Sequence, residues 1–150
     1  MKNNYEELQK KYTLPAYEEL NKDFEIYSIS KEDDLIRELL KKIRDVIDFY
    51  IDLLEGIIQP DSTYYVLKEA NAIDSQTRNQ VNTTYAKLLY INRENIEIHL
   101  DYNEKKATEF ILKTHNEWQE IKKELMPIIK TIKESWAHNK ETKNEGGYFG

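Results

Sequence analysis

The stretch KEDDLIRELLKKIRDVIDFYIDLLEGIIQP, residues 31–60, decides the fold because it carries one unbroken helical pattern. Its apolar residues recur every three or four positions, which is typical of a helix with a wide buried face. Ser30 and Asp33 have the form of an N-cap and its capping-box partner, and Pro60 ends the pattern. The apolar positions are Ile36, Leu39, Leu40, Ile43, Val46, Ile47, Tyr50, Ile51, Leu54 and Ile57.

Further helices are predicted downstream of this one. Asp61 or Ser62 can cap a short helix, and Asp74 or Ser75 can begin a second long one. That long helix has its apolar face at Val81, Tyr85, Leu88, Leu89 and Ile96.

The last long helix is predicted to start at a corner around Asp101–Glu104, which has capping-box form. Its apolar steps alternate between four and three residues, as in the seams of helical bundles. Pro127 is expected to kink or split it, because proline removes a backbone donor. The apolar series is Ala107, Ile111, Thr114, Trp118, Ile121, Leu125, Ile128 and Ile132.

One stretch is ambiguous between helix and strand. IEIHLDY, residues 96–102, alternates apolar and polar residues, which is typical of a half-buried strand. Residues 24–29 could pair with it, although two isolated strands are marginal in water. Because the helical pattern of residues 78–95 runs directly into this stretch, we expect the end of a helix here.

These patterns together predict an all-α domain, a three- to four-helix bundle. Residues 1–30 are expected to form N-terminal arm segments, residues 31–139 the bundle, and residues 140–150 a flexible C-terminal tail.

Composition narrows the functional classes. The 150 residues carry a net charge of −6, and residues 101–150 carry nine basic and nine acidic side chains. This balance argues against a nucleic-acid partner, which requires positive charge. No apolar run approaches the roughly 20 residues that span a bilayer. With no cysteine and no secretory pattern at the N-terminus, we expect a cytoplasmic protein without disulfides or thiolate metal sites.

The two ends of the chain carry the candidate partner-binding residues. YEELQKKYTL (5–14) and YEELNKDFEI (17–26) form an internal repeat, and EGGYFG (145–150) is an aromatic tip on a polar stretch. Tyrosine is favoured at interfaces, and short aromatic tips can dock into a partner. The repeat can instead pack across the bundle, and the tail can fold back or be inert. The candidate contact residues are Tyr148, Phe149, Tyr5, Leu8, Tyr17 and Leu20.

One short motif is similar to that of HEPN-type ribonucleases. Arg93 and His99 are separated by five residues, within the R-x4-6-H spacing of that all-α family. The resemblance implies RNA cleavage, with both residues on the scissile phosphate and two motifs brought together across a dimer. Glu94 stands where those enzymes carry a small polar residue.

Catalytic and cofactor-binding motifs other than this one are missing. The acidic stripe of Asp45, Asp48, Asp52 and Glu55 lies opposite the apolar face of its helix, and no Glu-x-x-His motif accompanies it. We therefore interpret it as a solvated face that could steer a basic partner, and we predict no metal and no cofactor.

The sequence thus favours a non-enzymatic interaction or adaptor protein within a larger assembly, bound to a protein partner that could present a basic surface. The alternatives are the HEPN-like ribonuclease and a structural homo-oligomer, for which a homodimer is the simplest form.

Overall fold

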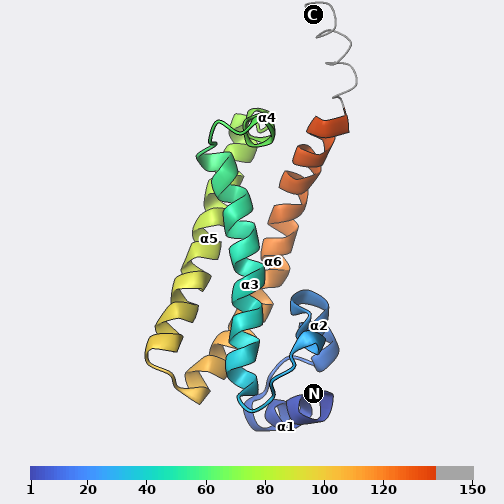
Figure 1. The fold of residues 1–150 in the computed structure, drawn as a ribbon, viewed down its shortest axis with the longest axis vertical. Coiled ribbons are helices and arrows are strands. Elements are labelled where there is room, and N and C mark those ends of the chain that lie inside the picture. The colour runs from blue at the N-terminus through green and yellow to red at the C-terminus, as the bar shows by residue number, and fades with distance from the viewer. Residues whose placement is uncertain (138–150) are drawn as a thin grey trace, which may run out of the picture. The chain divides into compact units, whose positions relative to one another are not determined.

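The structure is a computed structural model, and it describes residues 1–137. Within these residues the chain forms helices and no strand, so the predicted all-α fold is confirmed (Figure 1). The elements are α1 (Lys2–Tyr12), α2 (Tyr17–Phe24), a 3₁₀ turn (Ile26–Ser28), α3 (Leu35–Ile58), α4 (Tyr64–Asn71), α5 (Ser75–Leu100) and α6 (Glu104–Ala137).

The chain divides into two compact units. Unit 1 comprises residues 1–51 and 87–120, and the described part of unit 2 comprises residues 52–86 and 121–137. Unit 1 contains α1, α2, the 3₁₀ turn and one part each of α3, α5 and α6. Unit 2 contains α4 and the other parts of the three long helices.

Trp118 is buried in the core of unit 1, where it contacts residues of two other helices. Its ring lies 6.0 Å from that of Phe24 and 5.4 Å from that of Tyr50, so α2 and α3 both pack on α6. Beside this cluster, Gln119 donates to the carboxylate of Asp23 at 2.8 Å. Tilted ring contacts such as those of Trp118 add to the free energy gained by burying the rings.

Two buried amides join α5 to α3 within unit 1. Asn92 donates to Asp48 at 2.6 Å, and Asn95 donates to the backbone carbonyl of Leu40 at 3.0 Å. Asn92 and Asn95 are 6% and 1% exposed, so both amides lie in the packed face, while Asp48 at its edge is half-buried. Such buried polar contacts help to set the register of neighbouring helices.

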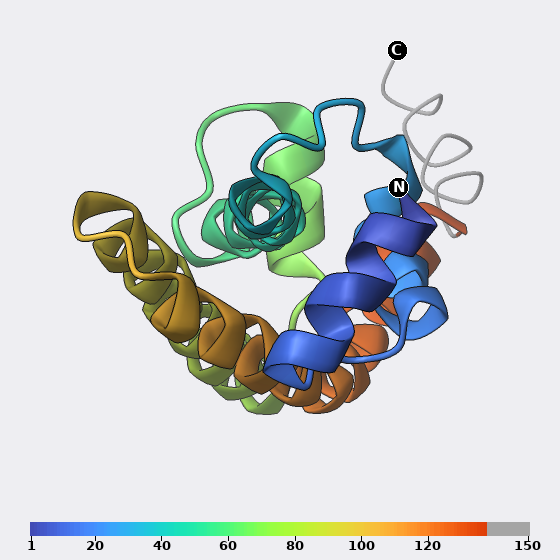
Figure 2. The same cartoon turned by 90° about the horizontal axis from the view of Figure 1, so that it is seen from below.

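The N-terminal repeat forms two short helices that pack into unit 1. Tyr5 on α1 is fully buried and donates its hydroxyl to the carbonyl of Pro15 at 2.7 Å. Lys11, at the end of α1, lies 3.8 Å from Glu104, at the start of α6. Helix α1 therefore lies across the end of unit 1 at which α6 begins (Figure 2).

Unit 2 is held together by contacts of its own. The guanidinium of Arg78 donates to the carbonyls of Ala70 at 3.0 Å and Ile57 at 3.4 Å, which are near the C-terminal ends of α4 and α3. Thr84 donates to Glu124 at 3.1 Å and joins α5 to α6. The two Arg78 contacts supply donors to carbonyls near helix ends, where intrahelical partners are lacking.

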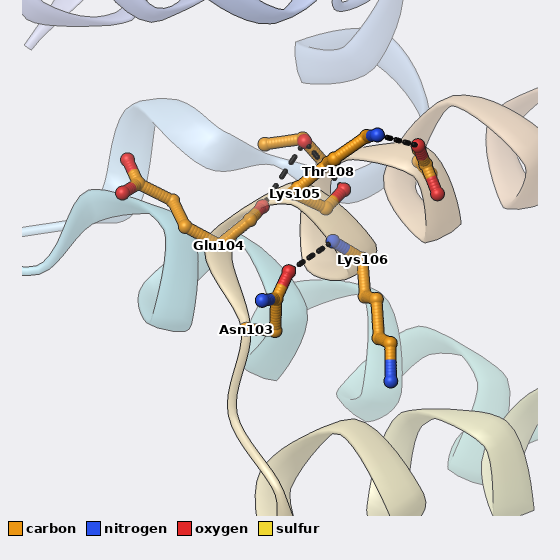
Figure 3. A network of polar contacts seen from close by, with 6 residues as sticks. Asn103, Glu104, Lys105, Lys106 and Thr108 are labelled. Carbon is orange, nitrogen blue, oxygen red and sulfur yellow. Dashed lines mark hydrogen bonds and ion pairs between the residues drawn. The ribbon is translucent and has the colours of Figure 1, made fainter.

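Helix starts differ from the sequence expectation by a few residues. Helix α3 begins at Leu35, and the carboxylate of Asp34 accepts the backbone N–H of Arg37, so Asp34 is the cap in place of Ser30. At the start of α6, the backbone N–H of Lys106 donates to Asn103 at 2.9 Å (Figure 3). Several neighbouring residues could cap each of these helices, and only one of them does so in the folded chain.

Helix α6 runs from Glu104 to Ala137 without a break at Pro127, so the expected split does not occur. Pro127 is exposed.

The ambiguous stretch after residue 95 is helical, because α5 continues through Leu100. The strand alternative is therefore wrong. The expected core position of Ile96 is also wrong, since Ile96 is 38% exposed while Ile98 is 8% exposed. The buried residues of α5 are Val81, Thr84, Leu88, Ile91, Asn92, Asn95 and Ile98.

Candidate functional site

A groove lies along α1 in unit 1, with a cavity volume of about 480 Å³. It is bounded by α1, by the residues that lead into α3, and by the corner between α5 and α6. We call it the α1 groove. Its acidic lining residues are Glu7, Glu32, Asp33, Asp34 and Glu104.

The apolar part of the α1 groove comes from both sides. Leu8 contributes a partly exposed side chain from α1, while Leu35 and Ile36 are buried at the start of α3. Leu8 is one of the contact residues proposed from the sequence. A groove with apolar side chains and acidic margins suits an amphipathic ligand with positive charge.

Some of the groove's carboxylates are already paired within the chain. Glu32 lies 2.9 Å from the amino group of Met1 and accepts from the side chain of Asn4. Because these contacts stabilise the ionised form, the pKa of Glu32 is lowered. Asp34 lies 2.8 Å from the Nε of Arg37.

Two other carboxylates of the groove have no partner in the part of the chain that the structure describes. These are Glu7, on α1, and Asp33, just before α3; both are exposed. The opposite wall carries Tyr102, whose pKa is raised by burial and then by the negative charges of Asp34 and Glu104. The groove therefore has carboxylates available for an added cation.

The ring of Tyr102, which lines the groove, is in contact with the guanidinium cation of Arg37. The guanidinium of Arg37 lies 3.9 Å above the ring centroid of Tyr102, a cation–π contact that fixes the ring beside the acidic residues. Asn103 and Glu104 follow directly. In Figure 3 the carboxylate of Glu104 points away from the side chain of Lys106, so the corner presents different groups to its two sides.

The second side of this corner forms a smaller pocket in unit 1, with a volume of about 330 Å³. We call it the α5–α6 pocket. The carboxylate of Glu94 pairs there with Lys113 at 3.0 Å, while Ile98 and Phe110 supply buried apolar surface. Its other charged lining residues are Glu97, Asp101, Glu109 and Lys106.

The partner-contact residues proposed from the sequence differ in how far the fold exposes them. Tyr5 and Leu20 are fully buried, so neither presents a surface to a partner of the folded chain. Leu8 and Tyr17 are partly exposed. Tyr148 and Phe149 lie outside the described residues.

Arg93 and His99 both lie on the continuous helix α5. Side chains six residues apart are about 9 Å apart along a helix axis and turned by about 120°. Arg93 is exposed and donates to the side chain of Asn92, while the pKa of His99 is lowered by burial and by Arg44 and Arg37. One chain alone does not bring the pair together, and the cross-dimer ribonuclease stays a prediction.

The described residues contain no group of three or more His, Cys, Asp or Glu side chains arranged to hold a metal ion. In the acidic stripe of α3, Asp48 is engaged by Asn92, while Asp45, Asp52 and Glu55 are exposed. No helix within residues 1–137 is both long enough and apolar enough to cross a bilayer.

The α1 groove was not predicted from the sequence. The signals were present as the run Glu32, Asp33 and Asp34 and as Glu7 beside Leu8, but these lie far apart in the chain. Comparison with protein-family models, with curated proteins and with solved structures found no match to this chain. Its function must therefore be inferred from its own residues.

Proposed function

We propose that this protein is a non-enzymatic interaction protein whose α1 groove binds a basic segment of a protein partner. The observation that carries the proposal is the pair of unpartnered carboxylates, Glu7 and Asp33, beside the partly exposed Leu8. A lysine or arginine side chain can place its apolar stem on Leu8 and its charge between the two carboxylates.

The distribution of charge supports the same partner chemistry. Unit 1 carries 14 basic and 19 acidic side chains, a net charge of −5. The described part of unit 2 carries six basic and seven acidic side chains, a net charge of −1. Unit 1 therefore exerts most of the long-range electrostatic attraction on a basic partner, and this attraction speeds the partner's association.

The proposal is tested with a fluorescent peptide of alternating lysine and glycine, whose binding is followed by anisotropy. Replacing both free carboxylates, Glu7→Gln with Asp33→Asn, is expected to raise the Kd about tenfold at low salt. The matched control is Asp52→Asn with Glu55→Gln, which removes one Asp and one Glu charge from exposed positions of unit 2. This control is expected to change the Kd less than about twofold.

Two outcomes would contradict the proposal. If the control pair weakens binding as much as the groove pair, the attraction reflects net charge alone. If the wild-type chain binds no basic peptide even at about 20 mM salt, the groove does not recognise basic segments. A chain truncated after Asn144 is expected to bind the peptide as the full chain does, because the groove lies within residues 4–104.

A further inference from the structure

Helix α5 ends in two exposed apolar side chains on one face. Ile96 is 38% exposed and Leu100 is 85% exposed, the largest exposed fraction among the exposed large hydrophobic side chains of the described chain. Residues four apart on a helix are neighbours on its surface. Ile98, between them in sequence, points into the core. The pair therefore forms an apolar patch in which most of Leu100 and a smaller part of Ile96 are exposed.

This apolar pair adjoins the acidic α5–α6 pocket. Glu97 and Asp101 each follow one member of the pair directly, and both line the pocket. Neither carboxylate has a side-chain partner in residues 1–137, whereas the neighbouring Glu94 is paired with Lys113. The end of α5 thus combines a partly exposed apolar patch with two free carboxylates, in a pocket whose four acidic residues outnumber its two lysines.

We infer that the Ile96–Leu100 face and the α5–α6 pocket bind a basic amphipathic helix. Apolar residues of the partner at helical spacing would cover Ile96 and Leu100, and its flanking lysines or arginines would enter the pocket toward Glu97 and Asp101. Helix-on-helix recognition uses apolar anchors at i and i+3 or i+4, which is the spacing of the exposed pair. Charge complementarity sets the sign of the partner's polar flank.

This inference rests on the proposed function and narrows the partner class. The α1 groove and the α5–α6 pocket share the corner, since Asp101 lines one and Tyr102 lines the other. A basic segment that enters the α1 groove can therefore continue along the end of α5 as a helix. The α1 groove attracts a positively charged partner segment in any conformation, whereas the α5 face requires a partner segment that carries an apolar stripe.

The probes are two fluorescent peptides of identical lysine and leucine composition. One has leucines at i, i+3, i+4 and i+7 and is amphipathic as a helix, and the other has leucine and lysine in alternation, which is not. Wild-type protein is expected to bind the first about tenfold more tightly than the second. The readout is the ratio of the two Kd values, measured by anisotropy.

The variant Ile96→Gln with Leu100→Gln is expected to reduce this ratio to about one. Both side chains are exposed, and glutamine is a good helix former, so the fold is retained. The matched control is Leu67→Gln with Met126→Gln, which removes two exposed apolar side chains from unit 2 and is expected to keep the ratio. Circular dichroism checks the helical content of each variant.

The outcomes separate this inference from the proposed function. If the groove variant Glu7→Gln with Asp33→Asn weakens both peptides while the α5 variant leaves the ratio unchanged, the inference is overturned and the proposed function stands. If neither variant changes binding, both fail. If sedimentation shows that the wild-type chain dimerises through this face and the α5 variant does not, the occupant is a second copy, and the inference is overturned.

Discussion

Thr13 and Glu25 are the two described residues other than glycine with a positive φ, at 56° and 51°. They are twelve residues apart, which is the shift of the YEEL repeat. Each follows a repeat helix and donates its backbone N–H to the carbonyl four residues earlier, Gln9 and Asn21 respectively. The repeated sequence therefore produces a repeated helix and a repeated left-handed end.

Thr13→Gly is expected to stabilise the protein by about 1 kcal/mol. A β-branched residue is strained in the left-handed region and glycine is not. The Thr13 side chain is exposed and makes no hydrogen bond to the described part of the chain. The free energy of unfolding from urea titration provides the measurement. The variant Thr13→Ala keeps a Cβ at the same φ and should show little gain. A gain in alanine as large as in glycine would show that backbone strain is not the cause.

His99 is expected to make the free energy of unfolding depend on pH. Its pKa is lowered in the folded state, first by burial and then by Arg44 and Arg37. Its Nε2 is buried and has no hydrogen-bond partner within residues 1–137. The unfolded chain therefore takes up this proton first as pH falls. The free energy of unfolding should decrease from about pH 6.5 down to the folded pKa.

The measurement is urea unfolding of wild type and of His99→Gln at pH values from about 7.5 to about 5.5. The variant should lose part of the pH dependence, because glutamine does not titrate in this range. If both proteins show the same slope, another group is responsible.

At the scale of elements, α6 connects the N-terminal helices to the long ones in unit 1. Its periodicity correctly predicted the buried series from Ala107 to Ile132. The same periodicity could not assign contacts to individual members of the series. Trp118 contacts α2 and α3 together, whereas Trp136 in unit 2 is only partly buried beside Tyr64.

Trp118→Ala is expected to cost about 3–5 kcal/mol, because a buried indole leaves a cavity and removes ring contacts to Phe24 and Tyr50. Trp136→Ala serves as the comparison and should cost roughly 1 kcal/mol, since its ring is partly exposed. Chemical denaturation monitored by circular dichroism gives both values. Equal losses would mean that Trp118 does not have the central packing role described for unit 1.

The end of α5 shows why periodicity alone was ambiguous at the element scale. In residues 96–100 a buried Ile98 stands between the exposed Ile96 and Leu100, so a helix with apolar residues on two faces resembles an alternating strand. An apolar residue in the sequence indicates that burial is favourable. It does not indicate whether this chain or a partner supplies the contact.

For the whole molecule, charge is unevenly divided between the two units. A lysine-rich peptide added to isotope-labelled protein should shift amide resonances mainly in residues 1–51 and 87–120, because unit 1 holds most of the surplus negative charge. The shifts should diminish as salt rises from about 50 to about 300 mM. Shifts concentrated in residues 52–86 would contradict this assignment.

The sequence by itself determined the helices, because helix formation depends on local spacing of apolar residues, on caps such as Asp74 and on terminators such as Pro60. The backbone N–H of Thr77 does donate to Asp74 at 2.7 Å, and α3 ends at Ile58. These are interactions within a few residues, which a pattern can record.

Only the tertiary structure decided which residues are buried and which line a site when two residues have equivalent positions in the sequence pattern. The two YEEL copies share their residues, yet Tyr5 is fully buried while Tyr17 is not, and Leu20 is fully buried while Leu8 lines the α1 groove. Burial and a shared electrostatic field depend on segments that are distant in the chain. Glu7, Asp33 and Glu104 become one acidic groove only when α1 lies beside the starts of α3 and α6.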